Sequence, residues 1–130
     1  MRVIEQEIIQ AIRTGSDFET GITEDMYRKK EGRRDVILWN EEYPGIFVYK
    51  LWGHQIAKGD TISRVLEVSD CGYATATTKS RLNAVFAALD IPVACSVRKG
   101  KMVYYLNGKE TQEKDIETSD YAISITGGVK

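Results

Sequence analysis

One short segment, residues 75–81, concentrates the side chains that could hold an anion. It reads TATTKSR, so hydroxyl groups and two cations stand close together. If a helix begins here, its first N–H groups and its dipole favour an anion, and the hydroxyls and cations add hydrogen bonds to a phosphate. We therefore predict a phosphate-binding site made of Thr77, Thr78, Lys79, Ser80 and Arg81, with Tyr73 or an aromatic residue of a strand, such as Trp52, stacking on a base.

The structural alternative for this segment is that Thr77, Thr78 or Ser80 simply caps the helix, and that Lys79 and Arg81 are solvated. The segment is not a P-loop, because it lacks the glycine spacing GxxxxGK[ST].

The residue types that dominate catalytic and metal sites are scarce. His54 is the only histidine, and the cysteines are Cys71 and Cys95. A catalytic histidine needs a nucleophile and an orienting acid, and no GxSxG elbow is present. One histidine and two cysteines make a four-ligand zinc site only if carboxylates complete it. We therefore predict no catalytic residue, no metal and no cofactor, and a structural or surface role for His54.

Two basic clusters could contact a nucleic-acid backbone or another protein. Their members are Arg28, Lys29, Lys30, Arg33 and Arg34 in one, and Arg98, Lys99 and Lys101 in the other. The net charge of the 130 residues is −1, which is unusual for a nucleic-acid-binding domain. However, residues 110–120 hold five acids and one lysine, so a basic end and an acidic end are compatible with this total. The alternative is a solvated charged face.

Hydrophobic periodicity sets out the elements that must position these residues. A helical period predicts a helix over 2–14, and another at about 78–90 that buries Leu82, Val85, Phe86 and Leu89. Between them, 36–40, 46–57 and 62–69 predict three consecutive antiparallel strands. A hairpin over 93–106, a turn at Asn107-Gly108 and a last strand at 121–126 follow, and 15–34 and 109–120 are predicted to be mobile loops.

This order of elements predicts a single α+β domain over 1–130, with a mainly antiparallel sheet and two helices packed on it. No apolar run reaches the length of a membrane span, and Glu5 and Glu7 interrupt the start where a signal peptide would be apolar. Free cysteines fit a reducing compartment. We therefore expect a cytoplasmic protein with no membrane partner, and the oligomeric state stays open.

Three segments together resemble a known family. They are LWGHQIA at 51–57, GYATATTKSRLNA at 72–84 and KGKMVYY at 99–105. They are similar to the patterns HGNxIA, TTKxRLNA and KKGxWY of small, uncharacterised proteins encoded by bacteriophages and prophages. The chain departs from these patterns with Trp52-Gly53-His54 in place of His-Gly-Asn, and with Val103 where the family often has Trp. The resemblance implies a phage accessory protein that acts inside a bacterial cell, and it brings no activity with it.

Two functional hypotheses from different classes follow. In the first, the protein binds a phosphate-bearing ligand, either nucleic acid or a nucleotide signal of host defence. In the second, it inhibits a host nuclease or defence complex in an anti-CRISPR-like manner, using the aromatic sheet and the charged segments at 28–34 and 110–120. An enzyme is the least favoured reading, because no catalytic constellation is present.

Overall fold

The computed structural model describes residues 2–20, 23–24, 31–32 and 34–126. The first helix, α1, spans Val3–Thr14, as the sequence predicts, and ends at Gly15, whose φ of 69° is the left-handed conformation that glycine adopts without strain. The other elements, in chain order, are β1 (Phe18–Thr20), β2 (Thr23–Glu24), β3 (Glu31–Gly32), β4 (Asp35–Trp39), β5 (Ile46–Leu51), β6 (His54–Asp60), β7 (Val65–Ser69), α2 (Ala76–Ala88), β8 (Val93–Arg98), β9 (Lys101–Leu106), β10 (Lys109–Thr111), β11 (Asp115–Glu117) and β12 (Ala122–Thr126).

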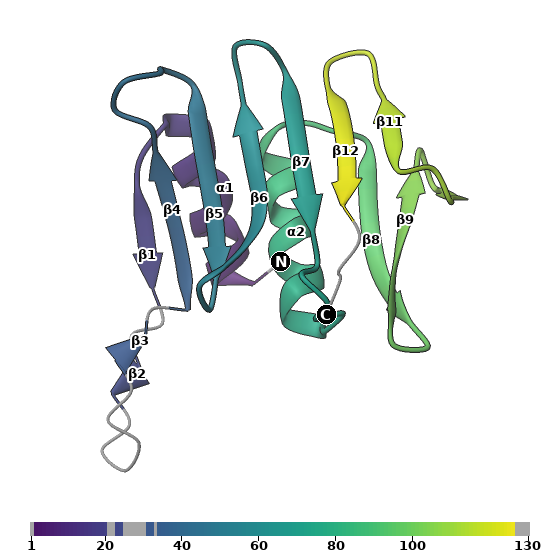
Figure 1. Ribbon diagram of the computed structural model, residues 1–130, viewed down its shortest axis with the longest axis horizontal. Coiled ribbons are helices and arrows are strands. Elements are labelled where there is room, and N and C mark those ends of the chain that lie inside the picture. The colour runs from purple at the N-terminus through teal and green to yellow at the C-terminus, as the bar shows by residue number, and fades with distance from the viewer. Residues whose placement is uncertain (1, 21–22, 25–30, 33, 127–130) are drawn as a thin grey trace.

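The main sheet has seven strands in the order β1-β4-β5-β6-β7-β12-β11, and both helices lie on one of its faces (Figure 1). Its neighbouring strands are antiparallel except for β7 and β12, which are parallel. A smaller sheet has the order β10-β9-β8, and β2 pairs with β3. This architecture is the predicted α+β fold with a mainly antiparallel sheet.

The prediction of three strands between 36 and 69 is wrong by one strand. The segment 46–57 is not one long strand, because the chain reverses at Trp52-Gly53 and forms the β5–β6 hairpin. Both residues have positive φ angles, 51° and 81°, as a two-residue type I′ turn requires. Tryptophan seldom adopts this conformation, so the sequence carries no ordinary turn signal here.

The predicted loops also contain strands. Segment 15–34 includes β1, β2 and β3, of which β1 pairs with β4, and segment 109–120 includes β10 and β11. The predicted turn at Asn107-Gly108 is confirmed and joins β9 to β10. These strands have only two or three residues each, which is too short for a period to be recognised in the sequence.

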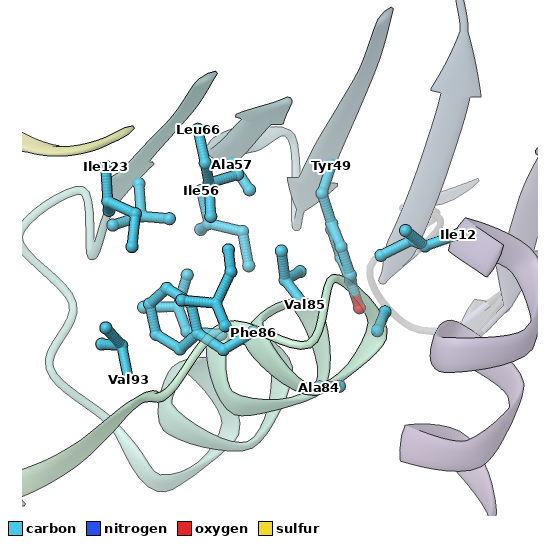
Figure 2. Close-up of a cluster of buried hydrophobic side chains, with 14 of the residues drawn as sticks. Ile12, Tyr49, Ile56, Ala57, Leu66, Ala84, Val85, Phe86, Val93 and Ile123 are labelled. Atoms are coloured by element: carbon cyan, nitrogen blue, oxygen red, sulfur yellow. The ribbon is translucent and has the colours of Figure 1, made fainter. Parts of the chain in front are cut away.

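The core lies between the helices and the sheet, and Figure 2 shows Phe86 and Val85 of α2 facing Ile56, Leu66 and Ile123 of the strands. Of the four α2 residues predicted to be buried, Leu82, Val85 and Phe86 are fully enclosed. The fourth, Leu89, is only partly buried, because the helix has already ended at Ala88.

The helix α2 is enclosed on several sides, since it packs against α1, β6 and β8. Its buried residues therefore include polar ones, Thr78, Ser80 and Arg81, next to the apolar set. A helix buried in this way does not divide into one apolar and one solvated face. The polar residues of 75–81 are consequently divided between the interior and the surface.

Candidate functional site

A cavity of about 410 Å³ lies where the β5–β6 turn meets the start of α2. Three parts of the chain that are distant in sequence form it: the β5–β6 hairpin, the loop after β7 and the first turn of α2. Its lining residues are Leu51, Trp52, His54, Ile56, Asp70, Tyr73, Thr75, Thr77 and Thr78. The fold therefore brings together two of the three segments that resemble the phage family.

The β5–β6 turn presents Trp52 at the cavity. This residue combines a left-handed φ of 51° with a side chain that is 51% exposed. Its backbone N–H donates a hydrogen bond of 2.7 Å to the carbonyl oxygen of Arg34, which ties the turn to the residue before β4. A large aromatic residue that is both strained and exposed contributes little to the core, and such residues concentrate at functional sites.

His54 and Tyr73 form a ring pair on the cavity wall, with centroids 5.0 Å apart and planes inclined at 42°. The loop that carries Tyr73 is tightly built: the Asp70 carboxylate accepts a hydrogen bond from the N–H of Gly72, and the Asp70 carbonyl accepts one from the N–H of Tyr73. The Cys71 thiol donates to the Gln55 carbonyl oxygen at 3.1 Å, which holds the loop against β6.

The helix cap is Thr75, and not Thr77, Thr78 or Ser80 as the sequence suggests. Its hydroxyl accepts a hydrogen bond of 3.2 Å from the N–H of Thr78 and lies 3.1 Å from the Thr78 hydroxyl. The N–H groups of Ala76 and Thr77, in the first turn, have no acceptor within the helix. Thr75 and Thr77 thus bring hydroxyl and N–H donors to the cavity, while Thr78 is buried behind them.

Arg81 does not lie at the cavity, which corrects the prediction of a solvated or ligand-binding cation. It is 3% exposed, and its Nε donates to Asp35 at 2.8 Å, while Nη1 donates to the Ser80 hydroxyl at 3.0 Å. Ser80 in turn donates to Glu5 of α1 at 2.9 Å. Ser80 and Arg81 therefore join α2 to β4 and α1, and neither is available to a ligand.

Asp35 is the centre of this buried network and is fully enclosed. It accepts hydrogen bonds from Tyr49 at 2.6 Å, from Arg34 at 2.8 Å and from Arg81 at 2.8 Å. Burial alone would raise the pKa of Asp35, but these three donors outweigh it and hold the pKa below its ordinary value of 3.8. The carboxylate is charged and fully partnered, so it serves the fold.

The remaining predicted residues have different surroundings. Lys79 is half-buried, and within the described part of the chain its ammonium group has no ion pair. In the first basic cluster, Arg28, Lys29, Lys30 and Arg33 lie outside the described residues, and Arg34 is paired with Asp35. In the second, Arg98, Lys99 and Lys101 line a separate hollow of about 340 Å³.

Trp52 and His54 line the cavity although the sequence favours a strand position for Trp52 and a structural or surface role for His54, and Asp70 was not foreseen at all. Gly53 in the middle of an aromatic run is a weak local sign of a break there, but no local pattern places Asp70 beside it. Among the described residues, no group of three or more His, Cys, Asp or Glu side chains could hold a metal ion. In the same part of the chain, no helix is long and apolar enough to cross a membrane.

The fold and the cavity define a small α+β protein with an aromatic-lined pocket between the β5–β6 turn of its main sheet and the start of α2. The family model described as Kyanoviridae Gp96 protein matches residues 1–126, and the chain belongs to this family of phage proteins. The resemblance to small phage-encoded proteins is confirmed at that level. No curated protein matches the chain. No solved structure matches it either.

Proposed function

We propose that this phage protein acts by binding and not by catalysis, and that it sequesters a phosphate-bearing aromatic ligand, a nucleotide or a nucleic acid, to counter host defence. The observation that carries the proposal is the cavity, because it places exposed aromatic rings next to hydroxyl and N–H donors. Its volume of about 410 Å³ lies within the range of small-molecule sites.

The ring end of the cavity suits a nucleobase. Trp52 and Tyr73 are both about half exposed, at 51% and 52%, so each has a free aromatic surface. Stacking on such rings is a common way to hold unpaired bases. Asp70 also lines the cavity. One oxygen of its carboxylate accepts the Gly72 N–H, and the other can accept from the exocyclic amino group of a base such as adenine or cytosine.

The helix end of the cavity suits the phosphate. The Thr75 and Thr77 hydroxyls and the first N–H groups of α2 are donors, and the helix dipole adds positive charge. The negative charge of Asp70 disfavours a phosphate at the opposite wall. The ligand would therefore lie with its base towards Trp52 and Tyr73, and its phosphate towards Thr77.

Titration with AMP, UMP and inorganic phosphate tests the proposal. We expect AMP to bind more tightly than UMP, which lacks the amino group, and Trp52→Ala to weaken AMP binding by about tenfold or more, since stacking contributes about 1–3 kcal/mol per base. The matched control is Tyr43→Ala, because Tyr43 is an aromatic residue of similar exposure, 61%, that does not line the cavity. Equal AMP affinity of the two variants, or no AMP binding by the parent protein, would reject the proposal.

The second candidate function is inhibition of a host nuclease or defence complex by protein–protein contact. The specific observation in its favour is the sheet face opposite the helices, where Leu38 and Val65 are 47% and 43% exposed. A phage carrying Leu38→Lys and Val65→Lys would then lose the protein's benefit during infection, while a phage carrying Trp52→Ala would keep it. If instead the Trp52→Ala phage loses the benefit and the Leu38→Lys, Val65→Lys phage keeps it, the cavity is the functional site.

A further inference from the structure

A second hollow, of about 340 Å³, lies between the tip of the β8–β9 hairpin and residues 111–114. Its lining includes the side chains of Lys99, Lys101 and Lys114, together with the apolar surface of Met102 and Ile125. The lining of the hollow is thus basic and partly apolar. It is distinct from the cavity at Trp52 and shares no lining residue with it.

The charge of this hollow is only partly neutralised by its surroundings. Arg98 is paired with Glu110 at 2.9 Å, but within the described residues Lys99, Lys101 and Lys114 have no ion pair. Among the lining residues the one carboxylate is that of Glu113, which has no ion pair within the described residues and offsets a single charge. The hollow therefore has a surplus of positive charge in a protein whose net charge is −1.

One turn that lines each hollow lies at the same end of the molecule: the β5–β6 turn for the cavity and the β8–β9 turn for the basic hollow. In Figure 1 the β5–β6 turn, the start of α2 and the β8–β9 turn all lie at the lower edge. Burial, and then the charges of Cys95 and Asp70, raise the pKa of Tyr104, so Asp70 of the cavity and Tyr104 of the basic hollow are within electrostatic reach of each other. Lys79 of α2 lines neither hollow; the Cys95 thiol of β8 donates to its carbonyl oxygen at 3.8 Å.

We propose that the ligand is single-stranded nucleic acid, with one nucleotide in the cavity at Trp52 and the neighbouring phosphates on Lys99, Lys101 and Lys114. This inference rests on the proposed function and extends it from one nucleotide to a strand. A mononucleotide leaves the basic hollow unused, whereas a strand places a phosphate at every nucleotide and can reach both. A duplex does not fit, because its paired bases are not free to stack on Trp52 and Tyr73.

The test compares dAMP, a deoxyadenylate strand of about 12 nucleotides, and the same strand paired with its complement. We expect the single strand to bind at least about tenfold more tightly than dAMP or the duplex. In Lys99→Ala/Lys101→Ala the salt slope of strand binding should become shallower by about 1.4, at about 0.7 per lost contact, and dAMP affinity should not change. The control, Lys58→Ala/Lys109→Ala, removes the same charge away from both hollows and should leave the slope unchanged.

The outcomes separate this inference from the proposed function. If dAMP binds in a Trp52-dependent manner but the strand binds no more tightly, the strand proposal fails and the nucleotide site stands. The same holds if both lysine pairs change the slope equally, which indicates only general charge attraction. If neither dAMP nor the strand responds to Trp52→Ala, the proposed function itself fails.

Discussion

The two sides of the start of α2 make opposite uses of similar residues. On the inner side, Ser80 and Arg81 are buried, and each has partners on other elements. On the outer side, Thr75 and Thr77 face a cavity whose rings, at Trp52 and Tyr73, are about half exposed. One polar segment thus serves the fold on one side and an open site on the other.

This difference shows which polar residues are informative about function. A buried group with all its hydrogen bonds made, like Asp35 with donors from Tyr49, Arg34 and Arg81, has no capacity left for a ligand. The exposed and strained Trp52 has no structural partner for its ring among the aromatic contacts of the described residues. Unused binding capacity, and not the presence of charge, marks the candidate site.

The largest effect is expected from Arg81→Ala. This change leaves Asp35 buried with a lost partner, so the free energy of unfolding should fall by about 3–5 kcal/mol. Urea denaturation measures it, with Arg64→Ala as the control, because the Arg64–Asp120 pair is exposed on both sides and should contribute at most about 1 kcal/mol. If the Arg81→Ala protein is as stable as the control, the buried Arg81–Asp35 pair does not stabilise the fold.

A comparable loss is expected from Phe86→Ala, which opens a cavity in the core between α2 and the sheet. Phe86 is 1% exposed, so the free energy of unfolding should fall by about 3–5 kcal/mol. The control is Tyr43→Ala, an exposed aromatic change with an expected effect within about 0.5 kcal/mol. Equal stability of the two variants would contradict the packing of α2 described above.

Acid should weaken the buried hydrogen-bond network around Asp35, on the inner side of α2, before it affects the packing of the core. The pKa of Asp35 is lowered by folding, so its contribution to stability is complete above its ordinary value of 3.8 and is lost as the pH falls through the lower folded value. Denaturation curves between neutral pH and about pH 2 measure this loss. Asp35→Asn should flatten the pH dependence, whereas Asp60→Asn, at an exposed turn, should preserve most of it.

The smallest effect on stability is expected from Lys79→Ala. A cation near the start of a helix opposes the helix dipole, so its removal should change the free energy of unfolding by no more than about 0.5 kcal/mol, towards greater stability. Binding of a deoxyadenylate strand should not change, because Lys79 lines neither the cavity nor the basic hollow. A loss of stability without a loss of binding would assign Lys79 to the inner side.

Much of the fold follows from local pattern. Ile8 and Ile12 with Gly15 define α1, Phe86 with its apolar neighbours defines most of α2, and Lys99-Gly100 and Asn107-Gly108 mark two turns. These signals are readable because spacing and turn chemistry act over a few residues. The three-residue strands β1, β10 and β11 were not predictable, since they are too short for a period to be recognised, and β1 in addition forms only by pairing with β4.

The candidate site was only partly predictable, because its lining comes from segments that are distant in the sequence. The sequence identified the threonines at the start of α2 and Tyr73, because a cap and its loop are local features. It did not indicate that Trp52 would turn the chain back, or that Asp70 would line the same cavity. Nor could it assign Arg81 to the interior, since that depends on Asp35, which is 46 residues away and reaches α2 only when β4 joins the sheet. The sequence by itself therefore determined which polar groups stand at the start of α2. Which of them are buried and which are available to a ligand was decided by contacts that exist only in the folded protein, because those contacts join residues that are distant in the sequence.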